Sequence, residues 1–137
     1  MKTTQLYYRI ALSLFSLAII YAVANSFFNY EAILTKFAEL GYPSYLIFVL
    51  GAAQLLGLTT LVFSKSNWIR EWAFAGFFLN FVFGIIAHLM IKDGNGASAV
   101  FCIIALYVTY VQNKKLNEQS KITSKDIHTQ PTLKTVA

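Results

Sequence analysis

The chain has 137 residues, of which 57% are hydrophobic and only 12% are charged. An average soluble domain is roughly 45–50% apolar and about 25% charged, and a domain this small has too little interior to bury the difference. The composition therefore argues against a cytosolic enzyme, a disordered chain and a disulfide-rich secreted module, and it indicates a membrane protein.

The charged residues leave four long intervals that contain no charge, at residues 10–30, 40–64, 72–91 and 94–113. Each interval is 20 to 25 residues long, and a helix needs roughly 20 mostly apolar residues to cross the hydrocarbon core. The sequence therefore predicts an all-α transmembrane four-helix bundle, with spans at about residues 10–28, 45–63, 72–90 and 98–111 in a membrane domain of residues 1–111.

The basic residues are unevenly divided between the two sides of this predicted bundle. Only Lys36 and Lys92 fall on the side away from the N-terminus. Cytoplasmic segments carry an excess of Lys and Arg, so both termini are expected in the cytoplasm. This topology also accounts for the net charge of +5, and no nucleic-acid partner is expected. The basic residues on the N-terminal side are Lys2, Arg9, Lys65, Arg70, Lys114, Lys115, Lys121, Lys125 and Lys134.

The first segment allows two interpretations. Basic residues, an apolar run and then Ala22-Val23-Ala24 resemble a secretory signal with a small-residue cleavage site. The apolar run continues through Phe27 and Phe28, which favours an uncleaved first helix. Cleavage after this small-residue stretch stays open.

A short amphipathic helix is predicted at residues 31–40, before the second span. Its apolar residues share one face at helical spacing, while Glu31, Lys36 and Glu39 are left for water. Such a helix is expected along the outer membrane surface. Gly41 is expected to end it, and Pro43 suits the first turn of the next helix.

Two amides lie near the middle of predicted spans: Gln54 in the second and Asn80 in the third. Polar residues at this depth are costly, so they need a partner. Amides often bond to each other or to a carbonyl and hold two helices together, and this reading is favoured. The alternative is that they line a pocket for a ligand head group.

The third span carries a stripe of residues spaced four apart: Gly76, Asn80, Gly84 and His88. The two glycines permit close approach of a neighbouring helix or a flat ligand, so the stripe is expected to face the bundle interior. His88 lies near the outer end of its span, at a depth similar to that of Asn25 in the first span. His88 is expected either to bond Asn25, a carbonyl or water, or to donate to a small ligand.

The rest of the chain offers little chemistry. Cys102 excludes an internal disulfide and is expected to be a small buried hydrophobe. No Cys/His cluster suggests a metal site, and no catalytic motif is recognised. Residues 112–137 are rich in Lys, Thr, Ser, Asn and Gln, and a disordered tail is predicted there.

Several short motifs resemble the DoxX-like family of small four-helix membrane proteins. The resemblance covers about residues 5–112, and its most specific part is the run Arg70-Glu71-Trp72-Ala73-Phe74-Ala75-Gly76-Phe77. It implies a bundle in the bacterial cytoplasmic membrane. Founding relatives are subunits of a thiosulfate:quinone oxidoreductase, and eukaryotic relatives resemble assembly factors for membrane receptors. The other matching pieces are Gly41-Tyr42-Pro43, Leu50-Gly51, Leu55-Leu56-Gly57, Ala87-His88 and Asp93-Gly94.

Two functions follow from these observations. The first is a small accessory subunit of a quinone-linked redox system, not an enzyme on its own, that binds a quinone-like or lipid-like molecule through Gln54, Asn80, His88 and Asn25. The second is a non-catalytic assembly factor or scaffold that docks a partner's transmembrane helix. Membrane lipid, an oxidoreductase subunit or another membrane protein, and a second copy of the chain are all candidate partners.

Overall fold

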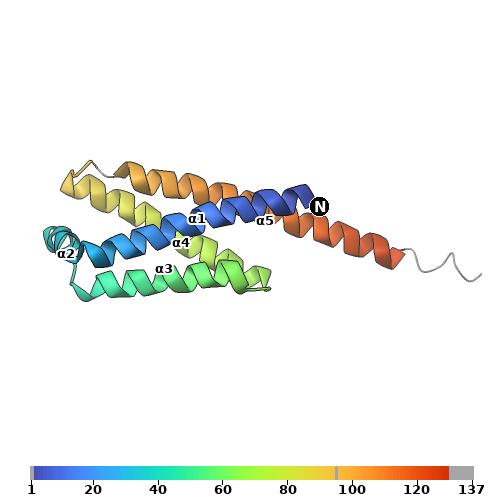
Figure 1. The fold of residues 1–137 in the computed structure, drawn as a ribbon, viewed down its shortest axis with the longest axis horizontal. Coiled ribbons are helices and arrows are strands. Elements are labelled where there is room, and N and C mark those ends of the chain that lie inside the picture. The colour runs from blue at the N-terminus through green and yellow to red at the C-terminus, as the bar shows by residue number, and fades with distance from the viewer. Residues whose placement is uncertain (1, 95, 130–137) are drawn as a thin grey trace, which may run out of the picture.

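The computed structural model describes residues 2–94 and 96–129, and in this part of the chain every regular element is a helix. The five helices are α1 (Lys2–Phe28), α2 (Tyr30–Glu39), α3 (Tyr45–Phe63), α4 (Asn67–Ile91) and α5 (Gly96–Thr129) (Figure 1). The prediction of an all-α bundle with a short helix between the first two spans is confirmed.

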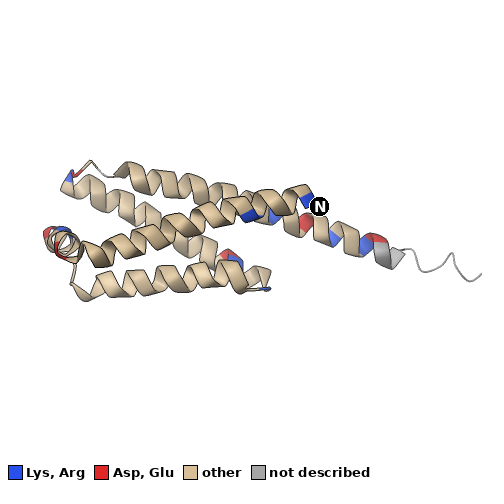
Figure 2. Ribbon diagram, viewed as in Figure 1, with Lys and Arg blue, Asp and Glu red and all other residues tan. Residues whose placement is uncertain are grey.

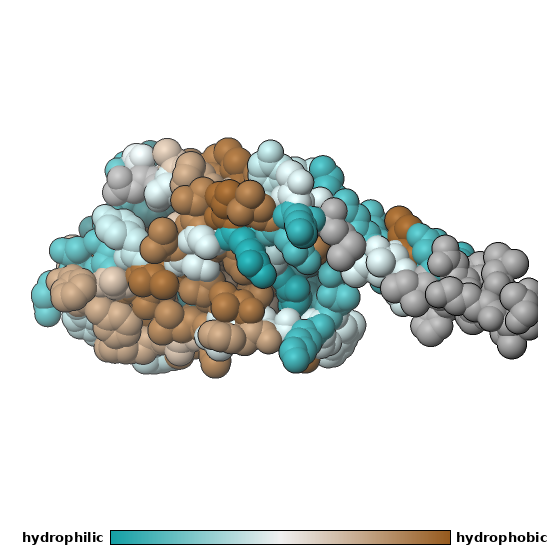
Figure 3. Space-filling model, turned by 45° about the vertical axis from the view of Figure 1, so that its right-hand side comes forward, coloured by the Kyte–Doolittle hydropathy of each residue, from teal (hydrophilic) through white to brown (hydrophobic). Residues whose placement is uncertain are grey.

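Four helices, α1, α3, α4 and α5, are long and apolar enough to cross a membrane. The space-filling view shows a broad hydrophobic band between more hydrophilic ends (Figure 3), and the charged residues gather at the two ends of the bundle (Figure 2). Lipid offers no hydrogen-bond partner to the backbone, so a segment in the membrane must pair its own N–H and C=O groups. A helix does so within itself.

The four long helices form a closed ring of contacts. Both α1 and α4 pack against α3 and α5, and α2 contacts α1. Figure 1 shows α2 lying across one end of the bundle, opposite the N-terminus. We call these the α2 end and the N-terminal end. The α3–α4 loop and the C-terminal part of α5 lie toward the N-terminal end.

Aromatic rings fill the centre of the bundle. Phe15 of α1 is fully buried, and its ring stands edge-on to Phe77 and Phe81 of α4, at centroid distances of 5.1 and 6.2 Å. Between helices in lipid the hydrophobic effect gives little net attraction, so close packing of such rings supplies most of the stabilisation. The other buried members of this core are Ile19, Val23, Leu58, Leu61, Phe74 and Leu106.

A polar contact between α1 and α4 lies at the N-terminal end. The guanidinium of Arg70 donates to the hydroxyl of Tyr8 and lies 5.2 Å from the centroid of its ring. Asn113 of α5 is also fully buried, and neither its amide nitrogen nor its oxygen has a partner in the described part of the chain. The core is therefore aromatic at its centre and polar toward this end.

The amphipathic helix ends as the sequence predicts. Gly41 has a φ of +72°, a left-handed conformation that glycine adopts without steric cost. The amides of Gly41 and Tyr42 donate to the carbonyls of Ala38 and Phe37, at 3.0 and 2.8 Å. These bonds close the last turn of α2 and redirect the chain into α3.

The largest departure from the sequence-based prediction concerns residues 112–129. The sequence suggests a disordered tail from residue 112, whereas α5 continues as a helix to Thr129. Residues 112–129 contain no Gly or Pro and many good helix formers such as Lys, Gln and Glu. A polar segment is unsuited to the hydrocarbon core, but its residues can still continue a helix. The remainder of the predicted tail, residues 130–137, lies outside the described residues.

Phe15→Ala is expected to lower the free energy of unfolding by about 3 kcal/mol, because it leaves a void against Phe77 and Phe81. Leu17→Ala on the same helix is the control, since Leu17 is 64% exposed and its loss should cost less than about 0.5 kcal/mol. Unfolding by detergent titration measures both. Equal destabilisation by the two variants would contradict the assignment of Phe15 to the core.

Candidate functional site

Gln54 and Asn80 line the same pocket. Gln54 lies midway along α3 and Asn80 lies near the middle of α4. The pocket between these helices has a volume of about 180 Å³, and both amides are half-buried. The rest of its lining is small or aromatic: Ala53, Gly57, Ala73, Gly76 and Phe77.

These two amides do not bond to each other. Among the residues that the structure describes, neither Gln54 nor Asn80 has a side-chain hydrogen bond. An unpaired amide at mid-membrane depth is unfavourable, because lipid provides no donor or acceptor in place of water. The pocket therefore presents two amides that a polar group from outside the bundle can pair.

His88 belongs to a separate polar cluster at the α2 end. Its Nδ1 lies 2.8 Å from Oδ1 of Asp93, and Oδ2 of the same carboxylate accepts from Nζ of Lys36 at 2.7 Å. The side chain of Asp93 is only 15% exposed. The cluster joins the end of α4 to α2, and it compensates the carboxylate on both oxygens.

His88 also lines a cavity of about 420 Å³ beside the α4–α5 turn, together with Lys92 and Val100. A carboxylate at Nδ1 favours the form of the ring that carries its hydrogen there. Nε2 is then the nitrogen that can accept a hydrogen bond from a ligand.

The structure separates the site residues that the sequence groups together. Asn25 accepts a hydrogen bond from Nδ2 of Asn29 at 2.7 Å, whereas His88 bonds Asp93. Asn80 and His88 are eight positions apart on α4, which corresponds to about 12 Å along a helix. One small ring cannot reach both side chains, although a head group with a long tail can.

The glycines of the α4 stripe have different surroundings. A Cβ added at Gly84 would meet Ala99 at 3.9 Å, which is ordinary packing against α5. A Cβ at Gly76 would meet nothing within 4 Å. Tight packing between α3 and α4 is found instead at Gly57, whose added Cβ would lie 2.9 Å from the ring of Phe77. Close packing of another helix against Gly76 stays a prediction, and that helix would have to come from another molecule.

Sequence reasoning missed Asp93 and Lys36 as parts of the polar cluster. In the sequence, Asp93 is typical of a turn residue and Lys36 of a solvated charge. Asp93 does lie just after the end of α4, and Lys36 lies on α2. The available signal was the spacing of five positions between His88 and Asp93 across a helix end. Nothing local in the sequence brings Lys36 to them, because the contact spans 57 positions.

The described residues contain no group of three or more His, Cys, Asp or Glu side chains that could hold a metal ion. Cys102 is a half-buried free thiol packed against the hydrophobic core. The polar groups identified among the described residues thus include the amides, the His88–Asp93–Lys36 cluster and the Arg70–Tyr8 pair.

These features define the class of protein: a small multi-pass helical membrane protein whose polar side chains line pockets between and beside its spans. A family model, the DoxX-like family, matches residues 10–110, and the chain belongs to that family. Searches of the curated proteins and of the solved structures each return no match to this chain.

Gly57→Ala is expected to lower the free energy of unfolding by about 1–3 kcal/mol, because the new methyl group displaces the buried ring of Phe77. Gly76→Ala, one of the other small residues of the same pocket, is the control. Its methyl group has open space, and alanine is the better helix former, so stability should be unchanged or slightly higher. Detergent-titration unfolding of both variants checks this; a destabilising Gly76→Ala would mean that α3 and α4 are closer there than described.

Proposed function

We propose that this protein is a small accessory subunit of a quinone-linked redox system and binds a quinone-like or lipid-like molecule within the membrane. The observation that carries the proposal is the pocket between α3 and α4, where the unpaired amides of Gln54 and Asn80 face a common space. Amide N–H groups are good donors to a ring carbonyl oxygen. A pocket of about 180 Å³ suits a single ring, with its tail left in lipid.

His88 lies apart from the amide pocket and stays in the proposal as a separate polar contact for a lipid-like ligand that carries more than one polar group. Because Asp93 holds Nδ1 of His88, Nε2 is the ring nitrogen left to hydrogen-bond a ligand. Asn25, which bonds Asn29, is kept in the proposal as a polar neighbour at similar depth, not as a partner of His88.

The proposed location is the bacterial cytoplasmic membrane, with both termini in the cytoplasm. The described Lys and Arg residues gather mainly at the N-terminal end, while Lys36 and Lys92 lie at the α2 end (Figure 2). This distribution agrees with the preference of basic residues for the cytoplasmic side.

The alternative function is a non-catalytic assembly factor that docks the transmembrane helix of a partner protein. The observation that favours it is the exposed backbone at Gly76, flanked by Ala73 and Asn80. Small residues with a nearby amide allow another helix to approach closely and hydrogen-bond. A second copy of the chain is one such partner.

Native mass spectrometry of the protein extracted gently from its own membranes tests the proposal. A quinone is expected at near-equal stoichiometry. Gln54→Ala and Asn80→Ala should each weaken its retention about fivefold, which corresponds to about 1 kcal/mol per hydrogen bond. Thr59→Ala is the control, because the Thr59 hydroxyl is exposed on α3 and bonds its own helix at Leu55. Unchanged retention in both site variants would refute the site, and a bound membrane protein without a small molecule would favour the assembly factor.

A further inference from the structure

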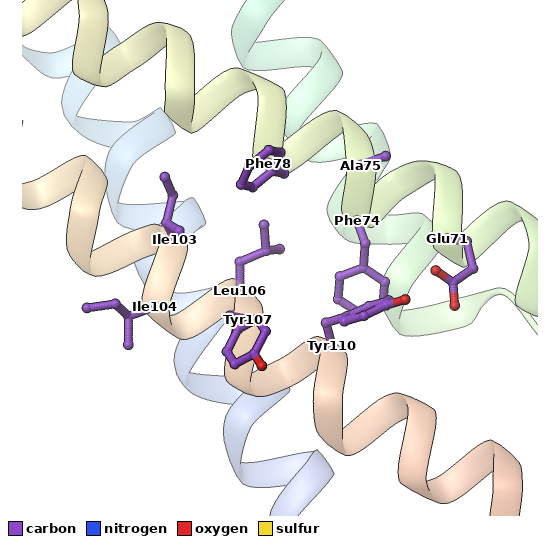
Figure 4. Close-up of a pocket in the computed structure, with 9 residues that line it drawn as sticks. All are labelled: Glu71, Phe74, Ala75, Phe78, Ile103, Ile104, Leu106, Tyr107 and Tyr110. Atoms are coloured by element: carbon purple, nitrogen blue, oxygen red, sulfur yellow. The ribbon is translucent and has the colours of Figure 1, made fainter.

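A second groove, distinct from the amide pocket, lies on the opposite flank of α4. It is formed between α4 and α5, has a volume of about 460 Å³ and is open to the surroundings of the bundle. Figure 4 shows the side chains of both helices converging on it. Most of the lining is aliphatic or aromatic: Phe74, Ala75, Phe78, Ile103, Ile104, Leu106 and Tyr107.

The groove begins at the N-terminal end and stops near mid-membrane. On α4 it runs from Glu71 to Phe78, about 10 Å along the helix. The hydrocarbon core is about 30 Å thick, so the groove lies within one leaflet. A partner's transmembrane helix would need a surface along the full span, and a helix with its side chains is about 10–12 Å wide. An extended hydrocarbon chain from that leaflet fits the length and shape better.

At its N-terminal end, which we call the mouth, the groove is lined by Glu71 and Tyr110, and Lys114 lies just outside the lining beside Tyr110. Glu71 is exposed and makes no hydrogen bond or ion pair within the described part of the chain. Nζ of Lys114 lies 5.6 Å from the ring centroid of Tyr110. The hydroxyl of Tyr110 is directed toward the carboxylate of Glu71 (Figure 4). The mouth therefore offers a carboxylate acceptor, a phenol and an ammonium donor above an apolar slot.

We infer that this groove binds a zwitterionic phospholipid with a primary ammonium head group, such as phosphatidylethanolamine, from the leaflet at the N-terminal end. One acyl chain lies in the slot between α4 and α5. The lipid phosphate pairs with Lys114, and the lipid ammonium donates to Glu71. An anionic phospholipid such as phosphatidylglycerol would also pair its phosphate with Lys114 but brings no ammonium group to Glu71. A choline head group carries positive charge but has no N–H to donate.

Native mass spectrometry of the full-length protein with an equal mixture of three lipids tests this inference. The lipids are phosphatidylethanolamine, phosphatidylcholine and phosphatidylglycerol with identical acyl chains. The first lipid bound is expected to be phosphatidylethanolamine, about threefold to fivefold over either competitor, as one charge-assisted contact at a partly exposed site allows.

Three variants separate the parts of the site. Glu71→Gln should abolish the preference for phosphatidylethanolamine over phosphatidylcholine, whereas Glu39→Gln, an exposed acid on α2, should keep it. Lys114→Gln should weaken all three lipids about threefold, whereas the neighbouring exposed Lys115→Gln should not. Ala75→Leu fills the slot with a helix-compatible side chain and should reduce occupancy by every lipid.

Two results would overturn the inference. One is a preference for phosphatidylglycerol or phosphatidylcholine, or a head-group preference that Glu71→Gln leaves unchanged. The other is lipid binding that is insensitive to Ala75→Leu while a co-purified membrane protein is lost, which would assign the groove to a partner helix. Neither result depends on whether a quinone occupies the pocket between α3 and α4.

Discussion

The edge-on contact of Phe15 with Phe77 and Phe81 sets the rotation of α4 about its own axis. Because these rings point to the centre of the bundle, residues at other angles around α4 point to its two flanks. Asn80 and Gly76 face α3 on one flank, and Glu71 and Ala75 face α5 on the other. One aromatic contact therefore decides which polar side chains can share a pocket. In lipid the hydrophobic effect does not favour one face of a helix over another. The rotation of a helix is therefore fixed by side-chain packing and by hydrogen bonds to its neighbours.

The polar side chains discussed above lie at three depths in the bundle, and they differ in how many hydrogen-bond or ion-pair partners they have. At the α2 end, Asp93 is compensated by both His88 and Lys36. At the N-terminal end, Arg70 bonds Tyr8, while the buried amide of Asn113 has no partner in the described residues. At mid-depth, the amides of Gln54 and Asn80 are half-buried and unpaired. Pairing is thus most complete in the ionic cluster, whereas Asn113 and the two mid-depth amides lack partners in the described residues. The proposed function rests on Gln54 and Asn80 because they line a common pocket.

Much of the architecture could be predicted from local sequence. The limits of α3 coincide with the predicted span of residues 45–63, and Gly41 ends α2 as expected. The candidate site was less predictable. Gln54 and Asn80 could be recognised because amides are rare in apolar windows, but their shared pocket depends on how α3 and α4 face each other. Their role as ligand groups, with His88 and Asn25, stays a prediction. The continuation of α5 to Thr129 was missed because polarity was taken as disorder.

The sequence by itself determined the number of spans, the short amphipathic helix and the uneven division of basic charge, because each depends on hydropathy and charge along a single segment. The tertiary structure alone decided that His88 pairs with Asp93 and Lys36, that Asn113 is buried, and that Glu71 stands at the mouth of an apolar groove. Those outcomes depend on the rotation and neighbours of each helix. Rotation is set by side-chain packing between segments far apart in the chain, and no local pattern encodes it.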